Sequence, residues 1–309
     1  MAMRLGVDLG GTKIEIIALD GRGHTPLRER ISTPTSGYDA IVAAIGDLVL
    51  SAEAKLGCRG TVGLAIPGAL SPRTGLVKNA NTIALNGRPL DADLSNALGR
   101  RVRVANDANC FTLSEATDGA AAGCNVAFGI IAGTGVGGGI CVGGRLVEGA
   151  HLIAGEWGHN PLPSPLATEI PGPACYCGRH GCIECWISGP ALAREFARRT
   201  GRSLPPEAIA KAALGGDAAA IAAMSQYIDR FARSLALVVN ILDPDAIVLG
   251  GGLSNIDMLE RELPERVEAY SFSPEVPPRI VRNFHGDSSG VRGAAWLWRE
   301  DEISAGLPS

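Results

Sequence analysis

One short pattern occurs twice in this chain: a strand, then a glycine-rich turn that carries a threonine, then a second strand. It appears near the N-terminus as "LGVDLGGTKIEIIAL" and again in the middle as "FGIIAGTGVGGGICVGGRLV". Internal repetition of this kind indicates two halves of similar structure. The repeat therefore predicts two similar domains, each opening on a β-hairpin, with both glycine turns facing a cleft.

The remaining sequence supports an α/β fold with two domains. Short aliphatic and β-branched runs bounded by glycine predict strands, and they alternate with segments of helical spacing at 38–56, 107–122, 189–199, 217–242 and 290–299. A chain of 309 residues also exceeds the size of a single hydrophobic core. The boundary is predicted at Gly119–Gly123, which gives a first domain of 1–119 and a second of 120–290.

Charge and hydropathy exclude several kinds of partner. The formal net charge of −4 offers no basic surface for a nucleic-acid backbone. No apolar run reaches the ~18 residues needed to cross a bilayer, and no signal peptide is recognisable. We therefore expect a cytoplasmic protein with no nucleic-acid and no membrane partner. Whether translation starts at Met1 or Met3 is left open.

The first glycine turn, "DLGGTK", has the composition of a phosphate-binding turn. Gly10 and Gly11 let backbone N–H groups approach an anion, while Thr12 and Lys13 add further donors. Asp8, at the end of the preceding strand, is a candidate for holding Mg²⁺, which prefers oxygen ligands. An ordinary hairpin turn is the alternative for this segment taken alone.

The second turn, "GTGVGG", matches the residue spacing of the dinucleotide-binding pattern G-x-G-x-x-G but not its structural context. That pattern requires a following helix, whereas a strand follows here. We interpret Gly133, Thr134 and Gly135 as a second phosphate turn. The run "DAIVLGGGLS" predicts a buried strand that ends at Gly251 and Gly252, where an adenine would lie against exposed backbone. A tight turn without a ligand explains that run equally well.

A strand followed by a helix in "VANDAN" offers a candidate general base. Asp107 suits the N-cap of the helix, and this structural role is the simpler explanation. The alternative is that Asp107 accepts the proton of a substrate hydroxyl while Asn106 orients the substrate. Four further polar residues lie in glycine-bounded loops and, together with these two, suit a neutral polyol such as a sugar: Asn81, Glu156, His159 and Glu184.

Cysteines cluster in the segment "GEWGHNPLPSPLATEIPGPACYCGRHGCIEC". A reducing compartment disfavours disulfides, so the cluster predicts a closed, structural zinc site of the Cys₃His type. Its ligands would be His159, Cys175, Cys177 and Cys182. The spacing does not exclude Cys185 and His180 as substitute zinc ligands. The alternative to a metal site is four free thiols. A catalytic zinc is disfavoured because four protein ligands leave no open position.

These motifs, in this order, resemble the ROK family of bacterial sugar kinases and repressors. The resemblance rests on "DLGGTK", "ANDAN", "GTGVGGG", "GEWGH", "CYCGRHGCIE" and "IVLGGG", and it covers essentially the whole chain. It implies an actin-like, ribonuclease H-like ATPase fold and ATP-dependent phosphorylation of a hexose. The segments "VKNANTIALNG", "GHNPLP" and "HGDSSGVRGAAWLW" are most similar to bacterial fructokinases of the manno(fructo)kinase type. We therefore expect phosphorylation of fructose at its 6-hydroxyl, with mannose as a second substrate.

The resemblance also implies a role for each matching position. It makes Asp107 the catalytic base, and it places Asn81, Asn106, Glu156, His159 and Glu184 against the sugar. Nucleotide-binding positions are Gly10, Gly11, Thr12, Lys13, Thr134, Gly135 and Gly251, and zinc ligands are His159, Cys175, Cys177 and Cys182. Cys185-Trp186 departs from the family pattern, where Thr-Phe is common.

Four further expectations accompany the resemblance. A C-terminal helix of about 291–309 would pack on the first domain, and a homodimer is expected. Glucokinase or N-acetylhexosamine kinase activity is the alternative within the family, since pocket shape decides specificity. A sugar-responsive repressor is disfavoured, because only "MAM" precedes the first hairpin where a helix-turn-helix would be needed.

Overall fold

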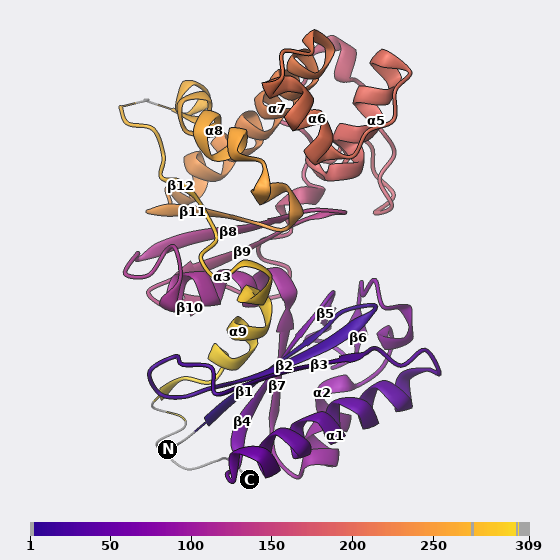
Figure 1. Cartoon of the computed structure of the whole chain (residues 1–309), viewed down its shortest axis with the longest axis vertical. Coiled ribbons are helices and arrows are strands. Elements are labelled where there is room, and N and C mark those ends of the chain that lie inside the picture. The colour runs from indigo at the N-terminus through magenta and orange to yellow at the C-terminus, as the bar shows by residue number, and fades with distance from the viewer. Residues whose placement is uncertain (1–2, 273–274, 301, 303–309) are drawn as a thin grey trace. The chain divides into compact units, whose positions relative to one another are not determined.

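The structure is a computed structural model that describes residues 3–272, 275–300 and 302 (Figure 1). It divides into two compact units. The first comprises Met1–Gly119, Arg145–Ala154 and Asp287–Ser309, and the second comprises Ala120–Gly144 and Gly155–Gly286. This division differs from the predicted one in two segments, because Arg145–Ala154 and the residues from Asp287 to 290 belong to the first unit.

The first unit is built on a five-stranded sheet of order β3-β2-β1-β4-β7. The hairpin of β1 and β2 and the pair β2–β3 are antiparallel, whereas β4 and β7 run parallel to β1. The strands are β1 (Met3–Leu9), β2 (Lys13–Leu19), β3 (Leu27–Ser32), β4 (Gly60–Ile66) and β7 (Val102–Asn106). A separate short pair comprises β5 (Ala69–Leu70) and β6 (Val77–Lys78).

Helices cover both faces of this sheet (Figure 1), which explains why apolar residues of its central strands are buried on both faces. Alternate residues of β2 belong to different hydrophobic clusters: Ile14 and Ile16 pack with α1 and α2, whereas Ile17 and Leu19 pack with α9. The helices of this unit are α1 (Tyr38–Leu56), η1 (Ile83–Leu85), α2 (Leu90–Leu98), α3 (Asp107–Asp118), η5 (Gly286–Ser288) and α9 (Ser289–Trp296). Only the last residues of η5 lie within it.

Helix α9 approaches its neighbours so closely that only glycine fits at the crossings. A Cβ atom at Gly63 would lie 1.8 Å from the carbonyl oxygen of Ala294, and one at Gly293 would lie 1.6 Å from that of Cys110. The helix therefore packs on β4 and α3 within the first unit, as expected. It spans Ser289–Trp296, so the predicted helix of about 291–309 is wrong at 297–299: these residues are not helical, and the buried Trp298 instead donates to the carbonyl of Val62. The parts of the prediction at 301 and 303–309 lie outside the described residues.

The second unit repeats the strand arrangement of the first. Strands β8 and β9 form an antiparallel hairpin, and β11 and then β12 extend the sheet in parallel, in the order β9-β8-β11-β12. This order matches β2-β1-β4-β7, so the predicted repeat of two hairpin-led halves is confirmed. The strands are β8 (Val126–Ala132), β9 (Val136–Val142), β11 (Ala246–Gly250) and β12 (Ile280–Arg282). The short β10 (Arg145–Leu146) follows β9 in sequence.

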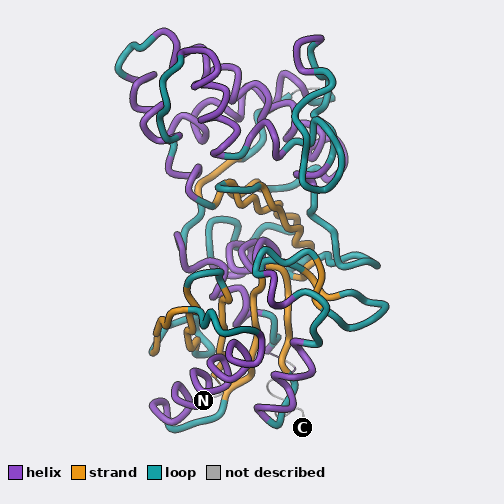
Figure 2. Tube along the Cα trace, turned by 90° about the vertical axis from the view of Figure 1, so that its right-hand side faces the viewer, coloured by secondary structure: helices purple, strands orange, loops and turns teal. Residues whose placement is uncertain are grey.

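The helices of the second unit share one hydrophobic core with its sheet (Figure 1, Figure 2). At its centre lies α7, whose Tyr227, Phe231 and Leu235 are buried. The helices are η2 (Trp157–His159), η3 (Ala167–Glu169), α4 (Glu184–Ile187), α5 (Gly189–Thr200), α6 (Pro206–Leu214), α7 (Ala218–Leu242), η4 (Gly252–Asn255) and α8 (Asp257–Tyr270).

Among the described residues, no single helix is both long and apolar enough to cross a bilayer. The bent pair of α6 and α7 reaches the required length and apolar composition only when the two helices are taken together.

Candidate functional site

The first glycine turn joins β1 to β2 and is closed by its own backbone. The amide of Gly10 donates to the carbonyl of Lys13 at 3.0 Å. Thr33 holds the turn from outside, since its hydroxyl donates to the Gly10 carbonyl at 2.8 Å and its amide to the Thr12 carbonyl at 3.0 Å. The Gly10 amide is thus already used, so an anion would be bound by the amides of Gly11 and Thr12.

Asp8 and Asp107 lie at the carboxyl ends of β1 and β7, close enough for the charge of Asp107 to raise the pKa of Asp8. Burial, and after it the negative charges of Asp107 and Glu15, raise the pKa of Asp8 to about 7, against the opposing charge of Lys13. The ends of β1 and β7 bring the two carboxylates together from positions about a hundred residues apart in sequence. A divalent cation or a second positive group would favour the ionised form of Asp8.

Asn106, rather than Asp107, caps helix α3. Its side-chain oxygen accepts from the amides of Ala108 at 2.9 Å and Asn109 at 3.3 Å. Its side-chain nitrogen donates to the carbonyl of Gly68 at 3.3 Å. Asp107 is the first helical residue, so the simpler sequence interpretation of Asp107 as the cap is wrong. The sugar-orienting role of Asn106 stays a prediction, with the carboxamide already bonded within the protein.

The Pro67–Gly68 turn also fixes the loop that carries Asn81. The amide of Asn81 donates to the carbonyl of Pro67 at 3.1 Å. A Cβ atom at Gly68 would lie 2.9 Å from the Cα atom of Ala80, so the loop approaches this turn closely. Thr82 has its hydroxyl 4.0 Å from the Cβ position of Gly11, which puts the loop beside the first glycine turn. Asn81 itself is exposed.

The second glycine turn joins β8 to β9 in the other unit. The Gly133 amide donates to the Gly135 carbonyl at 2.9 Å, and the Gly133 carbonyl accepts from Gly189 at 2.8 Å. Glu184, predicted to contact the sugar, accepts from the amide of Val136 at 2.8 Å through Oε2. Thr134 lies at the tip of this turn, between the two glycines.

The predicted adenine-binding run ends beside this second turn. Because β8 and β11 are parallel neighbours, their carboxyl ends meet at the same edge of the sheet. Gly251 has φ of 75°, and a Cβ atom there would lie 2.4 Å from the carbonyl of Ala132. A Cβ atom at Gly133 would lie 3.9 Å from the amide nitrogen of Gly252. The glycine-rich end of β11 and the second turn therefore form one backbone surface.

Tyr176 contacts one predicted sugar-binding residue of the second unit and lies within the electrostatic influence of two others. The Tyr176 hydroxyl forms a hydrogen bond of 2.9 Å with Nε2 of His159, and the two rings meet edge to face at 5.1 Å. Burial and the charges of Glu184 and Glu156 raise the pKa of Tyr176 to about 12. The sequence interpretation overlooked Tyr176, although an aromatic residue between two candidate metal ligands was a signal for it.

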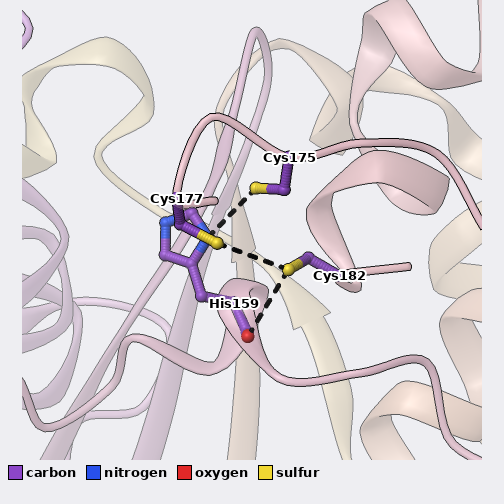
Figure 3. A group of neighbouring side chains, drawn as sticks. All are labelled: His159, Cys175, Cys177 and Cys182. Atoms are coloured by element: carbon purple, nitrogen blue, oxygen red, sulfur yellow. Dashed lines mark hydrogen bonds between the residues drawn. The ribbon is translucent and has the colours of Figure 1, made fainter. Parts of the chain in front are cut away.

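The four predicted metal ligands come together (Figure 3). All ligand atoms of His159, Cys175, Cys177 and Cys182 lie within 4.8 Å of one another. Nδ1 of His159 is 3.6 Å from Sγ of Cys175, and the sulfurs of Cys177 and Cys182 are also 3.6 Å apart. Tetrahedral zinc with bonds of about 2.0–2.3 Å places its ligands roughly 3.3–3.8 Å apart. The donor set and its spacing therefore fit zinc.

The spare candidates lie outside this group of four. Cys185 points its sulfur to the carbonyl of Ala174 at 3.6 Å, and His180 is exposed and pairs with Ala174 through its backbone. The cysteines are unpaired, and the 3.6 Å between the sulfurs of Cys177 and Cys182 is far beyond the ~2.05 Å of a disulfide. A disulfide knot is thus not formed.

A buried ion cluster fixes the loop that follows His159. Glu169 accepts from Arg230 at 2.7 Å and from Arg233 at 3.1 Å, and all three side chains are almost fully buried. Arg233 also donates to the carbonyls of Pro163 at 3.0 Å and Ser164 at 2.8 Å. Arg230 and Arg233 of α7 thereby anchor the loop 161–171 to that helix. Sequence reasoning missed this cluster because no local pattern pairs Glu169 with residues sixty positions away.

The chain was compared with known proteins. The ROK family profile matches residues 4–301. The N-acetyl-D-glucosamine kinase of Pectobacterium atrosepticum is 41% identical over 299 residues, covering 96% of this chain and 98% of the relative. The enzyme of the same name from Escherichia coli O157:H7 is 40% identical over 303 residues, covering 97% and 100%.

Solved structures give the same result. The ROK hexokinase of Thermus thermophilus superposes with a TM-score of 0.86 at 32% identity, covering 98% of this chain and all of that one. The ROK family glucokinase of Streptomyces griseus, in complex with glucose and AMPPNP, has a TM-score of 0.77 at 28% identity and covers 97% and 100%. The fold is therefore the actin-like α/β ATPase fold of these proteins, as expected. On the family match and these relatives, the chain belongs to the ROK family, among its sugar kinases.

Proposed function

We propose that this protein is an ATP-dependent N-acetyl-D-glucosamine kinase. The observation that carries the proposal is its 40–41% identity, over nearly its full length, to kinases of that name. The expected preference for fructose, with mannose as a second substrate, has no support among the relatives described above. They favour the alternative of an N-acetylhexosamine kinase instead.

The proposed mechanism assigns the transfer step to the first unit. Asp107 would accept the proton of the attacking sugar hydroxyl, and Asn81 and Asn106 would orient the sugar. Phosphoryl transfer passes through a loose transition state, so a base of ordinary pKa suffices and positioning contributes most. Mg²⁺, held near Asp8, would offset charge on the transferring phosphoryl oxygens. The Asp8 carboxylate suits that ion, since its pKa is raised first by burial and then by the negative charges of Asp107 and Glu15, and a bound cation would offset both effects.

The nucleotide is assigned to the two glycine turns and the end of β11. Donors to the phosphates are proposed from each turn by itself: Gly11, Thr12 and Lys13 from the first turn, and Thr134 and Gly135 from the second. The adenine would lie against Gly251 and Gly252, where side chains are absent. Glu156, His159 and Glu184 would complete the sugar site. A homodimer and a cytoplasmic location stay predictions.

The cysteine cluster is proposed to hold a structural zinc ion. His159, Cys175, Cys177 and Cys182 supply four ligands, which closes the coordination shell. Zinc would fix the segment that carries His159, Tyr176 and Glu184, because its ligands extend from His159 at the start of that segment to Cys182 near its end. The metal would therefore shape the sugar pocket without entering phosphoryl transfer.

A coupled assay of ADP release across a panel of sugars tests the proposed function. The panel is N-acetylglucosamine, N-acetylmannosamine, glucose, mannose and fructose, each with Mg·ATP. We expect the highest kcat/KM for N-acetylglucosamine. A higher kcat/KM for fructose or glucose would refute the substrate, and no turnover with any sugar would refute the kinase function.

A further inference from the structure

Glu184 occupies a position where three parts of the second unit meet. It is the first residue of α4 and lies two residues after Cys182, a member of the metal-ligand group. Its Oε2 atom accepts the amide of Val136, the first residue after the second glycine turn, at 2.8 Å. Its charge is also felt at the hydroxyl of Tyr176. One half-buried carboxylate therefore contacts the turn and lies two residues from a member of the metal-ligand group.

The segment that begins with Glu184 holds the turn at both ends. Glu184 bonds Val136 on the far side of the turn, and the amide of Gly189 donates to the carbonyl of Gly133 at its start, at 2.8 Å. A Cβ atom at Gly135 would lie 2.7 Å from Oε2 of Glu184, so the carboxylate fills the space beside the turn. Glycine at 135 is thus explained by this side chain as well as by a phosphate.

The same segment is anchored to the metal-binding loop and to the core. The amide of Ile183 donates to the carbonyl of Asn160 at 2.8 Å, next to His159. The buried hydroxyl of Tyr227 donates to the carbonyl of Ile187 at 2.6 Å. Residues 183–189 are consequently held at both ends, and a displacement of Glu184 requires the turn or the loop to move with it.

We propose that Glu184 is a positioning residue for the nucleotide turn, in addition to its predicted contact with the sugar. One carboxylate oxygen fixes the Val136 amide and so orients the Thr134 and Gly135 amides toward phosphate. The other oxygen remains for the sugar side, which couples the two substrates through one side chain. This inference rests on the proposed kinase function, because it takes the turn to bind a nucleotide.

Nucleotide affinity measured without sugar separates the two roles of Glu184. We would titrate wild type, E184Q and E184A with MgADP by calorimetry. A hydrogen bond from a backbone amide to a carboxylate, when lost, costs enough to weaken binding by about tenfold or more. E184A should therefore bind MgADP about tenfold more weakly. E184Q keeps an acceptor for the Val136 amide and should stay within about threefold of wild type, while its sugar affinity falls.

A matched control is Glu265→Ala. Glu265 is an exposed carboxylate in α8, outside the residues assigned to the nucleotide and the sugar. E265A should leave sugar-free MgADP affinity unchanged. Gly135→Ala provides an independent test, because the added methyl group displaces the Glu184 carboxylate from the turn. G135A should weaken MgADP as E184A does, and the double variant G135A/E184A should be no weaker than either.

The outcomes distinguish this inference from the proposed function. Unchanged MgADP affinity in E184A would overturn the inference and leave the kinase function intact. If circular dichroism shows that E184A does not fold, G135A and E184Q test the inference in its place. Wild-type MgADP affinity in G135A, or tenfold weaker MgADP binding in E184Q, would overturn the inference. If wild type binds MgADP but phosphorylates no sugar, only the proposed function fails. Wild type that does not bind MgADP at all overturns both.

Discussion

The hydroxyl of Tyr176 lies 2.9 Å from Nε2 of His159, whose other nitrogen is 3.6 Å from the sulfur of Cys175. Both ring nitrogens of His159 are therefore engaged within one loop. The resemblance assigns His159 both to the metal and to the sugar, which requires one free nitrogen for each. The tyrosine occupies the second position, so a sugar must replace its hydroxyl or bind beside it.

Removing the Tyr176 hydroxyl should strengthen sugar binding. In Tyr176→Phe, Nε2 of His159 loses a competing partner, while the contact at Nδ1 still fixes the ring. A net hydrogen bond of ~1 kcal/mol corresponds to roughly a fivefold gain in affinity for N-acetylglucosamine. Calorimetric titration with the sugar measures this. Weaker binding in Y176F would instead make the hydroxyl a supporting partner of His159.

Replacing the proposed base should abolish catalysis but spare binding. Asp107→Asn keeps the size of the side chain and removes its basicity, so kcat should fall by about 10²-fold or more. Sugar affinity should stay within about tenfold, because the loss is confined to the transition state. Asp39→Asn is the matched control, since Asp39 is an exposed acid in the first turn of α1. Near-wild-type kcat in D107N would remove Asp107 from the mechanism.

The stability of the nucleotide-free protein should fall as the pH rises toward 7. Asp8 has a pKa of about 7 in the folded chain, against an ordinary value of 3.8, so the folded state binds more protons between these values. Stability therefore decreases across that window and is level above it. Asp8→Asn cannot ionise, so it should be more stable than wild type at pH 8 by on the order of 1 kcal/mol, about 2–4 °C in Tm.

Thermal melts of wild type and D8N across pH 4 to 8 measure this difference. The two curves should approach each other toward pH 4, where the Asp8 carboxyl is protonated in the folded chain and only about half ionised in the unfolded chain. Parallel curves would show that Asp8 is not the titrating group. The charges that act on Asp8 come from Asp107, Glu15 and Lys13. D107N removes one of the negative charges, so it should lower the pKa of Asp8 and reduce the loss of stability between pH 4 and 8.

Removal of the metal should weaken sugar binding and leave the rest of the fold intact. We expect one zinc per chain by elemental analysis, lost in Cys177→Ser and after chelation. Because the cluster fixes the loop carrying His159 and Glu184, sugar affinity should fall by about tenfold or more. Cys58→Ser is the control, since Cys58 lies outside the cluster. Unchanged sugar affinity after complete removal of zinc would contradict this account.

Close packing of α9 predicts opposite effects for two glycine substitutions. In Gly293→Ala, the new methyl would lie 1.6 Å from the Cys110 carbonyl, so α9 must move off α3. We expect a loss of about 3 kcal/mol or more, roughly 6 °C or more in Tm. Gly46, inside α1, has nothing within 4 Å of its Cβ position, so G46A should stabilise by about 0.5–1 kcal/mol. Equal effects of the two substitutions would contradict the packing.

Local patterns in the sequence were sufficient for the repeated hairpins, the long helices and the metal-ligand set. Helix α1 spans the predicted residues 38–56 as Tyr38–Leu56, because apolar residues recur at helical spacing and Gly57 ends it in a left-handed conformation. Other elements were not predicted. Helix α8 contains Pro264, which ordinarily breaks a helix, and β3 alternates charged residues at the sheet edge.

Tertiary structure decided what each polar residue contacts. The sequence alone determined the α/β class, the glycine turns and the clustering of His159 with the cysteines, since these follow from residue type and spacing. It did not determine that Asn106 caps α3, that Thr33 holds the first turn, or that Glu184 holds the second. The Asn106 cap is local, but Asn106 and its neighbour Asp107 both suit an N-cap, so residue type does not choose between them. The bonds of Thr33 and Glu184 join residues 23 and 48 positions apart, and no local periodicity indicates such a pairing. Only the folded chain brings those donors and acceptors within bonding distance.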